Sequence, residues 1–246
     1  MSRKLLKWLP FTFVLLVLTG CSMDKPIDPD NGFWDKYLVN PVSVSLDWFA
    51  DNLWGSYGLS ILVVTIIVRF LILPLTLKQY KSSKQMQAIQ PELKKLKEKH
   101  KDDPKKQQEE TMKLFQTNGV NPLAGCFPLI VQMPILIALY NAIVRNDEIS
   151  SHSFLWMELG EKDPYFILPL LAAATTYIQQ KIMAKYTPMP SQMQTLMYIF
   201  PVLIFVMAMN FASALPLYWV YSNIFTIVQT YFIYGGSQIK GGLVKK

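Results

Sequence analysis

The stretch from Tyr57 to Leu77, YGLSILVVTIIVRFLILPLTL, constrains the fold most, because it can cross a bilayer yet carries an arginine in its interior. A transmembrane helix needs roughly 20 mostly apolar residues. Eight uncharged residues separate Arg69 from Lys78, which places its Cα about 12 to 14 Å inside the apolar run. A central arginine costs about 2.5 to 3.5 kcal/mol on insertion scales, so we expect it to face water or polar groups. The alternative is a side chain that extends to the lipid headgroups without a functional role.

The composition is typical of a membrane protein. Hydrophobic residues make up 51% of the 246-residue chain and charged residues only 17%, so several uncharged runs exceed what a soluble core needs. The net charge is +7, and the lysines are concentrated beside apolar runs. That placement is the orientation signal of a membrane protein. We expect these lysines to meet anionic lipid or ribosomal RNA and not DNA.

The N-terminus has the pattern of a bacterial lipoprotein signal peptide. Arg3, Lys4 and Lys7 precede the apolar run Trp8 to Leu18, and Leu18-Thr19-Gly20-Cys21 follows as a lipobox. Cleavage before Cys21 would leave this cysteine with a lipid such as palmitate on the outer face of the plasma membrane. The alternative is that residues 5–18 form an uncleaved anchor. The sequence predicts no disulfide, metal site or cofactor site.

The distribution of apolar runs and charges predicts an all-α membrane protein with five transmembrane spans. An outer amphipathic helix over Pro41 to Trp54 is expected to lie in the membrane interface. Lysine-rich segments would lie in the cytoplasm and acidic segments outside, as the positive-inside bias requires, with Arg145 as the one exception. The predicted segments are a signal peptide at 1–20, an extracellular segment at 21–56, spans at 57–77, 121–145, 164–183, 193–210 and 216–234, a cytoplasmic hairpin at 78–120 and a basic cytoplasmic tail at 235–246.

The segment Lys78 to Lys113 carries eleven lysines and six acidic residues, and it predicts a charged helical hairpin. Its apolar residues at helical spacing are few: Met86, Ile89, Leu93 and Leu96. Pro91 would bend or interrupt the first helix. Asp103 is expected to cap a second helix that starts at Pro104, with Met112 and Phe115 on its inner face. The alternative is a solvated linker.

The polar residues inside the predicted spans fall on shared helical faces. Ser222, Thr226 and Gln229 lie at i, i+4 and i+7 and form one stripe. Such residues usually form hydrogen bonds between spans. Together with Arg69 they could instead line a wet cavity, because a guanidinium has five donors to satisfy. The spans contain no carboxylate for acid–base chemistry, and the chain has only two histidines, so we do not expect an enzyme.

Two stretches resemble a known family. Asn121 to Tyr140, NPLAGCFPLIVQMPILIALY, is similar to the second-span signature of the YidC membrane protein insertases, and Met86 to His100, MQAIQPELKKLKEKH, resembles their cytoplasmic hairpin. With the lipobox, the chain looks like the five-span Gram-positive type. The resemblance implies an insertase and chaperone with a hydrophilic groove open to the cytoplasm and to lipid. The groove residues implied here are Arg69, Thr65, Gln132, Gln179, Trp219 and Gln229.

The resemblance also implies partners. Arg69 would attract acidic residues in the short N-terminal tail of a nascent membrane protein, after which the apolar segment would enter the lipid. The hairpin would recruit the ribosome and the signal recognition particle, with the Sec translocon as a further candidate. Two other hypotheses remain at this point: a small transporter or channel in which Arg69 binds an anion, and a lipoprotein that only assembles partners.

Overall fold

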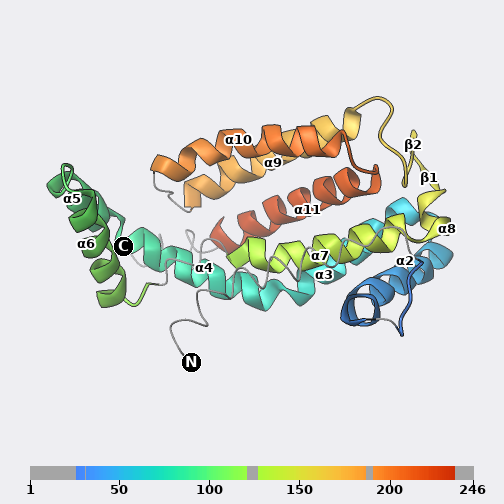
Figure 1. Cartoon of the computed structure of the whole chain (residues 1–246), viewed down its shortest axis with the longest axis horizontal. Helices are drawn as coiled ribbons and strands as arrows, with labels where there is room; N and C mark the ends of the chain where they lie inside the picture. The colour runs from blue at the N-terminus through green and yellow to red at the C-terminus, as the bar shows by residue number, and fades with distance from the viewer. Residues whose placement is uncertain (1–25, 31, 121–126, 187–190, 236–246) are drawn as a thin grey trace.

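The computed structural model of this chain describes residues 26–30, 32–120, 127–186 and 191–235, and these residues are mostly helical. The predicted signal peptide, Cys21, Asn121 to Cys126 and residues 236–246 of the basic tail lie outside the described residues. Long helices run roughly along one direction, with a helical hairpin at one end and a short helix, a strand pair and an outer helix at the other (Figure 1).

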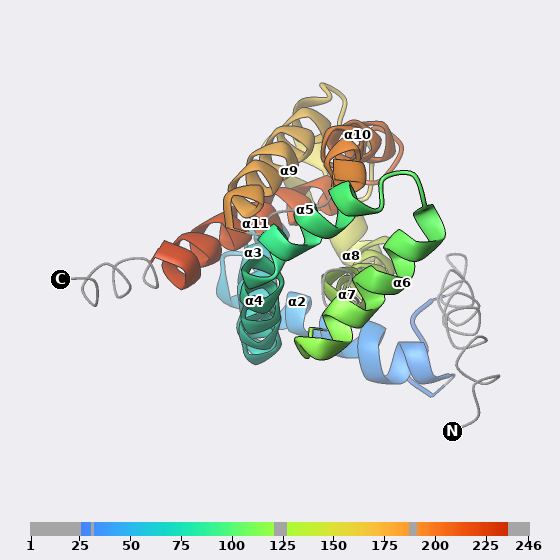
Figure 2. The same ribbon diagram turned by 90° about the vertical axis from the view of Figure 1, so that its left-hand side faces the viewer.

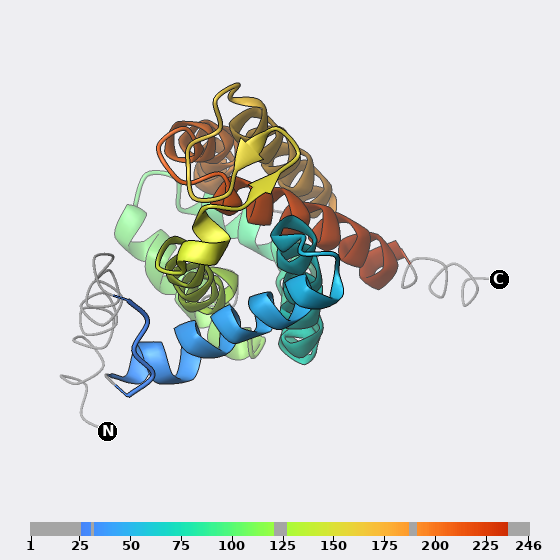
Figure 3. The ribbon, with the colours of Figure 1, turned by 90° about the vertical axis from the view of Figure 1, so that its right-hand side faces the viewer.

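The outer helix begins as a π-helix, η1 (Asp35–Val39), and continues as α2 (Asn40–Asn52). Leu46 is fully buried, whereas Trp48 is 60% exposed and Trp54 is 91% exposed. Helix α2 therefore has a buried and an exposed face, and Trp54 lies beyond its end at Asn52. Its position in the membrane interface stays a prediction. Ser60 of the following helix donates a hydrogen bond of 2.6 Å to the Leu46 carbonyl and joins α2 to its neighbour. Figure 3 shows α2 crossing the end of the molecule near the strand pair.

The first predicted span is bent. Helix α3 (Tyr57–Leu71) ends at Ile72, and α4 (Leu73–Ala88) continues at an angle of 55°. Pro74 lies in the first turn of α4, where a missing N–H is tolerated. In a straight continuation of α3 the same proline would lie inside the helix and disrupt it, so the helix bends there. The predicted boundary at Leu77 therefore falls inside α4.

No helix within the described residues is, on its own, long and apolar enough to span a membrane, although α3 and α4 meet this test as a bent pair. Val131–Val144 and Tyr198–Ala208 are shorter apolar helical segments. The count of five spans therefore stays a prediction.

The charged segment forms a hairpin of α5 (Gln90–Lys99) and α6 (Pro104–Thr117) at the end of the molecule (Figure 2). Pro91 lies in the first turn of α5, so the helix is interrupted at Ile89. Asp103 accepts a hydrogen bond of 3.0 Å from the Lys106 amide and caps α6 as predicted. The prediction for Met112 was wrong, because the residue is 45% exposed, whereas Phe115 is half-buried.

Helix α7 (Phe127–Val144) contains Pro134 and leads into the short α8 (Asp147–Ser150). The acidic segment after it, which lies between the predicted spans at 121–145 and 164–183, contains a two-stranded antiparallel pair, β1 (Ser153–Phe154) and β2 (Met157–Glu158). The buried Asp163 carboxylate accepts hydrogen bonds from Trp156 and from the Leu168 amide, which fixes the start of α9 (Ile167–Tyr186).

Two further long helices complete the bundle: α10 (Ser191–Ala208), with Pro201 inside it, and α11 (Ala214–Thr230), followed by η3 (Tyr231–Gly235). Ser213 and Ala214 donate to the carbonyls of Glu161 and Leu159, so the α10–α11 turn is bonded to the segment after β2. The turn between these two helices covers residues 209–213, close to the boundary between the predicted spans at 193–210 and 216–234. Helix α11 packs against α9 on one side and α3 on another, so it lies at the centre of the bundle.

Candidate functional site around Arg69

Arg69 lies in the last turn of α3, just before the bend. Its Nη2 atom donates a hydrogen bond to the Ser222 hydroxyl on α11. Ser222 is buried, with 3% of its surface exposed, whereas Arg69 is half-buried. The edge-to-face contact of Phe70 with Phe225, with ring centroids 5.6 Å apart, holds the same two helices together.

The Arg69 guanidinium has no carboxylate within ion-pair distance among the described residues, whose two ion pairs are Lys113–Glu110 and Arg145–Asp35. A charge in a low-dielectric region is strongly disfavoured unless water or polar groups surround it. Within the described residues, the positive charge of Arg69 is therefore met by a neutral hydroxyl and not by an acidic group.

Gln132 connects the third helix of the site. Its Nε2 atom donates a 2.5 Å hydrogen bond to the Tyr218 hydroxyl on α11. Tyr218 is buried and lies one helical turn before Ser222 on α11. The structure therefore groups Arg69 of α3, Gln132 of α7, and Tyr218 and Ser222 of α11.

Thr65 is buried, and its hydroxyl donates to the Ile61 carbonyl of its own helix at 2.6 Å. A threonine bonded to the carbonyl four residues earlier has used its only donor. It therefore contributes an oxygen acceptor and a methyl group to its surroundings, but not a hydroxyl proton.

For the other three predicted groove residues, the structure shows no hydrogen bond to Arg69 or its partners within the described part of the chain. Trp219 is half-buried and packs against both apolar clusters of the bundle. Gln179 and Gln229 are half-buried, and within the described part of the chain neither forms a hydrogen bond with Arg69. The polar contact between α9 and α11 is made instead by Asn223, which donates to Thr175 and Thr176 at 3.0 and 2.8 Å.

Ser222 belongs to the polar stripe that could line a wet cavity with Arg69, but neither Ser222 nor Tyr218 is among the six predicted groove residues. Ser222 carried a signal, because it begins the i, i+4, i+7 stripe on α11. Tyr218 carried none, since one more tyrosine in an aromatic-rich helix is ordinary. The described residues contain no group of three His, Cys, Asp or Glu side chains that could hold a metal ion.

Arg145 is the exception to the predicted charge distribution, and its contacts at the end of α7 account for its position. Its guanidinium donates to both Asp35 carboxylate oxygens at 2.8 and 2.6 Å, and to the Pro26 carbonyl at 2.9 Å. This charge-assisted contact lowers the pKa of Asp35 below its ordinary value of 3.8. Arg145 therefore fastens the start of the described chain to α7.

A family model described as 60Kd inner membrane protein matches residues 48–240. The membrane protein insertase MisCA of Bacillus subtilis (strain 168) is 52% identical over 242 residues, which cover 96% of this chain and 93% of the relative. Membrane protein insertase YidC 2 of Bacillus anthracis is also 52% identical, with 95% and 94% covered. A crystal structure of an active YidC insertase with its first transmembrane domain resolved matches with a TM-score of 0.67 and 29% identity, over 82% of this chain and 47% of that chain.

Proposed function

Because this chain belongs to the YidC family of membrane protein insertases, we propose that it takes apolar segments of newly made proteins into the plasma membrane. The observation that carries the proposal is the positive charge of Arg69, bonded to a neutral hydroxyl and without a carboxylate partner among the described residues. The named relatives are all insertases, so a small transporter or channel is not favoured.

Arg69 acts in this proposal as a temporary counter-charge. An acidic N-terminal tail of a substrate pairs with it in a hydrophilic groove and so crosses less of the hydrocarbon as a bare charge. The groove is formed by Arg69, Thr65, Gln132, Gln179, Trp219 and Gln229, and we add Tyr218 and Ser222. Release outward is favoured by the membrane potential, which contributes about 2.3 kcal/mol per negative charge per 100 mV.

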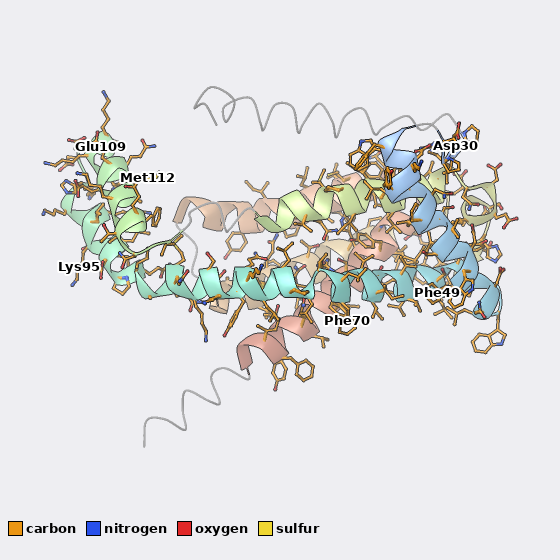
Figure 4. All side chains as sticks on the ribbon, turned by 90° about the horizontal axis from the view of Figure 1, so that it is seen from below. Asp30, Phe49, Phe70, Lys95, Glu109 and Met112 are labelled. Carbon is orange, nitrogen blue, oxygen red and sulfur yellow. The ribbon has the colours of Figure 1, made fainter. Side chains whose placement is uncertain are left out.

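The proposed topology has five spans, with α2 in the outer interface and Cys21 lipidated outside. It is supported by the distribution of charge along the molecule. Figure 4 shows Asp30 at one end of the structure and Lys95 of the hairpin at the other, and lysines outnumber acidic residues by eleven to six between Lys78 and Lys113. The lysine-rich hairpin, the cytoplasmic part of this topology, would recruit the ribosome or the signal recognition particle. Deletion of residues 84–104 without loss of insertion would contradict that role.

The direct test is insertion by the purified protein reconstituted in liposomes. The substrate is a small phage coat-like protein with an acidic N-terminal tail, and protease protection reports its insertion. We expect Arg69→Ala to lose insertion and Arg69→Lys to retain it, because a positive charge is what the tail needs. Equal failure of both variants, with normal amounts of protein in the membrane, would indicate a structural arginine and overturn the mechanism.

A second substrate makes the test specific. The same coat protein with its tail acids replaced by asparagine and glutamine should be inserted equally well by wild type and by Arg69→Ala. If Arg69→Ala impairs both substrates to the same extent, the arginine does not act through the charge of the tail. If the purified wild-type protein inserts neither substrate without other proteins, the result would favour a protein that only assembles partners.

A further inference from the structure

A cavity of ≈ 280 Å³ lies beneath the outer helix, between η1–α2, α3 and α7. Its floor is formed by residues of low exposure, among them Val64, Ala138 and Leu139, while Tyr37 and Leu71 are largely exposed. Arg69 does not line it. The cavity therefore adjoins the site around Arg69, and Thr65 and Tyr218 contribute to both.

The wall of this cavity is suited to hydrocarbon. Most of its lining side chains are aliphatic or aromatic, and the hydroxyls of Ser45 and Thr65 donate to carbonyls of their own helices, at 2.6 Å each. The phenol groups of Tyr37 and Tyr218 also belong to the lining. A mostly aliphatic and aromatic wall of this kind accommodates a chain of methylene groups through van der Waals contacts. The volume lies at the lower end of the range of ligand pockets, so it suits one acyl chain better than a whole lipid.

The start of the described chain is fixed close to the cavity. Arg145 holds both the Pro26 carbonyl and the Asp35 carboxylate through the same Nη2 atom. Asp35 opens the helix whose residues Tyr37 and Leu38 line the cavity. The lipobox cysteine, Cys21, precedes Pro26 by five residues and so lies within about 17 Å of it at full extension.

We propose that this cavity holds one acyl chain of the lipid carried on Cys21. The inference rests on the proposed lipidation. Several transmembrane spans already hold the protein in the membrane far more strongly than a lipid can, so the lipid is not needed as an anchor. Seated between α2, α3 and α7, the acyl chain instead fills the space beneath the outer helix and fixes α2 against the bundle.

The experiment uses the full chain in its own membrane. Cells are grown with a photoactivatable fatty acid, which enters both membrane phospholipids and the Cys21 lipid, and are then irradiated. After digestion, mass spectrometry separates two kinds of adduct on peptides that contain residues 37–49 or 64–71. One kind joins them to the Cys21 lipopeptide, and the other carries the mass of a phospholipid.

We expect the adduct with the Cys21 lipopeptide. Val42→Trp, which fills the cavity from α2, should lower its yield at least about fivefold. Val44→Trp is the matched control, because Val44 is 57% exposed on the same helix and should leave the yield within about twofold. Hydrogen exchange of α2 should rise in Cys21→Ser and in Val42→Trp but not in Val44→Trp.

Two results would overturn the inference, and they are distinguishable. Phospholipid adducts alone on the lining peptides would show that the cavity takes bulk lipid while the lipidation stands. An unmodified Cys21 in the mass spectrum would remove the lipidation and the inference together. Neither result affects the insertase proposal, which the reconstitution with Arg69 variants tests separately.

Discussion

Arg69 and Ser222 lie 153 positions apart in the sequence, and a hydrogen bond from the guanidinium to the serine hydroxyl joins them across α3 and α11. The bond orients the arginine without neutralising it, because a hydroxyl carries no charge. An arginine held this way remains available to a carboxylate, whereas an arginine in a closed ion pair is not.

Removal of the Ser222 hydroxyl should therefore weaken insertion without abolishing it. A polar contact between membrane helices is worth about 0.6 to 1.7 kcal/mol, so Ser222→Ala should slow insertion of the acidic-tailed substrate by roughly three- to twentyfold. Thr226→Ala is the control, because the Thr226 hydroxyl donates to the Ser222 carbonyl of its own helix. Equal slowing by both variants would mean that the Arg69 contact has no special role.

The contact between Gln132 and Tyr218 should stabilise the packing of α7 on α11. We expect Tyr218→Phe and Gln132→Leu each to lower the thermal stability of the protein in detergent. The double variant should be less destabilised than the sum of the two, with a coupling free energy of about 1 kcal/mol. Strictly additive effects would show that the hydrogen bond contributes nothing measurable.

The ion pair of Arg145 with Asp35 should make the attachment of the outer segment pH-dependent. The folded-state pKa of Asp35 is lowered from 3.8, so its contribution to stability is present above pH 3.8 and is lost as the pH falls through the lowered value. Hydrogen exchange of residues 32–40 should increase in that acidic range. Arg145→Ala should show the increased exchange already at neutral pH, and Arg145→Lys should be intermediate because lysine lacks the bidentate fork. Wild-type exchange that does not change below pH 3.8 would contradict the assignment.

The cap of α6 offers a test of the hairpin. Asp103→Ala should destabilise the first turn of α6 by about 1 kcal/mol, since the Lys106 amide loses its acceptor. Exchange of the amides of residues 105–107 reports the change. Asp102→Ala is the matched control, because Asp102 is an exposed neighbour in the same turn. If Asp102→Ala increases exchange of these amides as much as Asp103→Ala does, the destabilisation comes from the loss of a negative charge and not from the loss of the cap.

The sequence alone determined the class of the protein and the positions of many helix ends. Long uncharged runs, prolines and a capping aspartate are local signals, because they act through the solvent and the backbone next to them. They predicted the membrane protein, the isolated arginine, the interrupted helix at Pro91 and the cap at Asp103. The bend at Ile72 was missed, although Pro74 was a visible signal for it.

Only the tertiary structure decided which side chains meet. Helical periodicity tells which residues share a face, but the rotation of one helix against another is set by the packing of all their neighbours. For that reason the sequence did not predict that Arg69 donates a hydrogen bond to Ser222, or that Thr65 donates one to a carbonyl of its own helix. Arg145, which the charge distribution left as an exception, was explained by Asp35, 110 positions away. The cavity beneath α2 likewise arises from three elements that are distant in sequence, and no local pattern encodes the space between them.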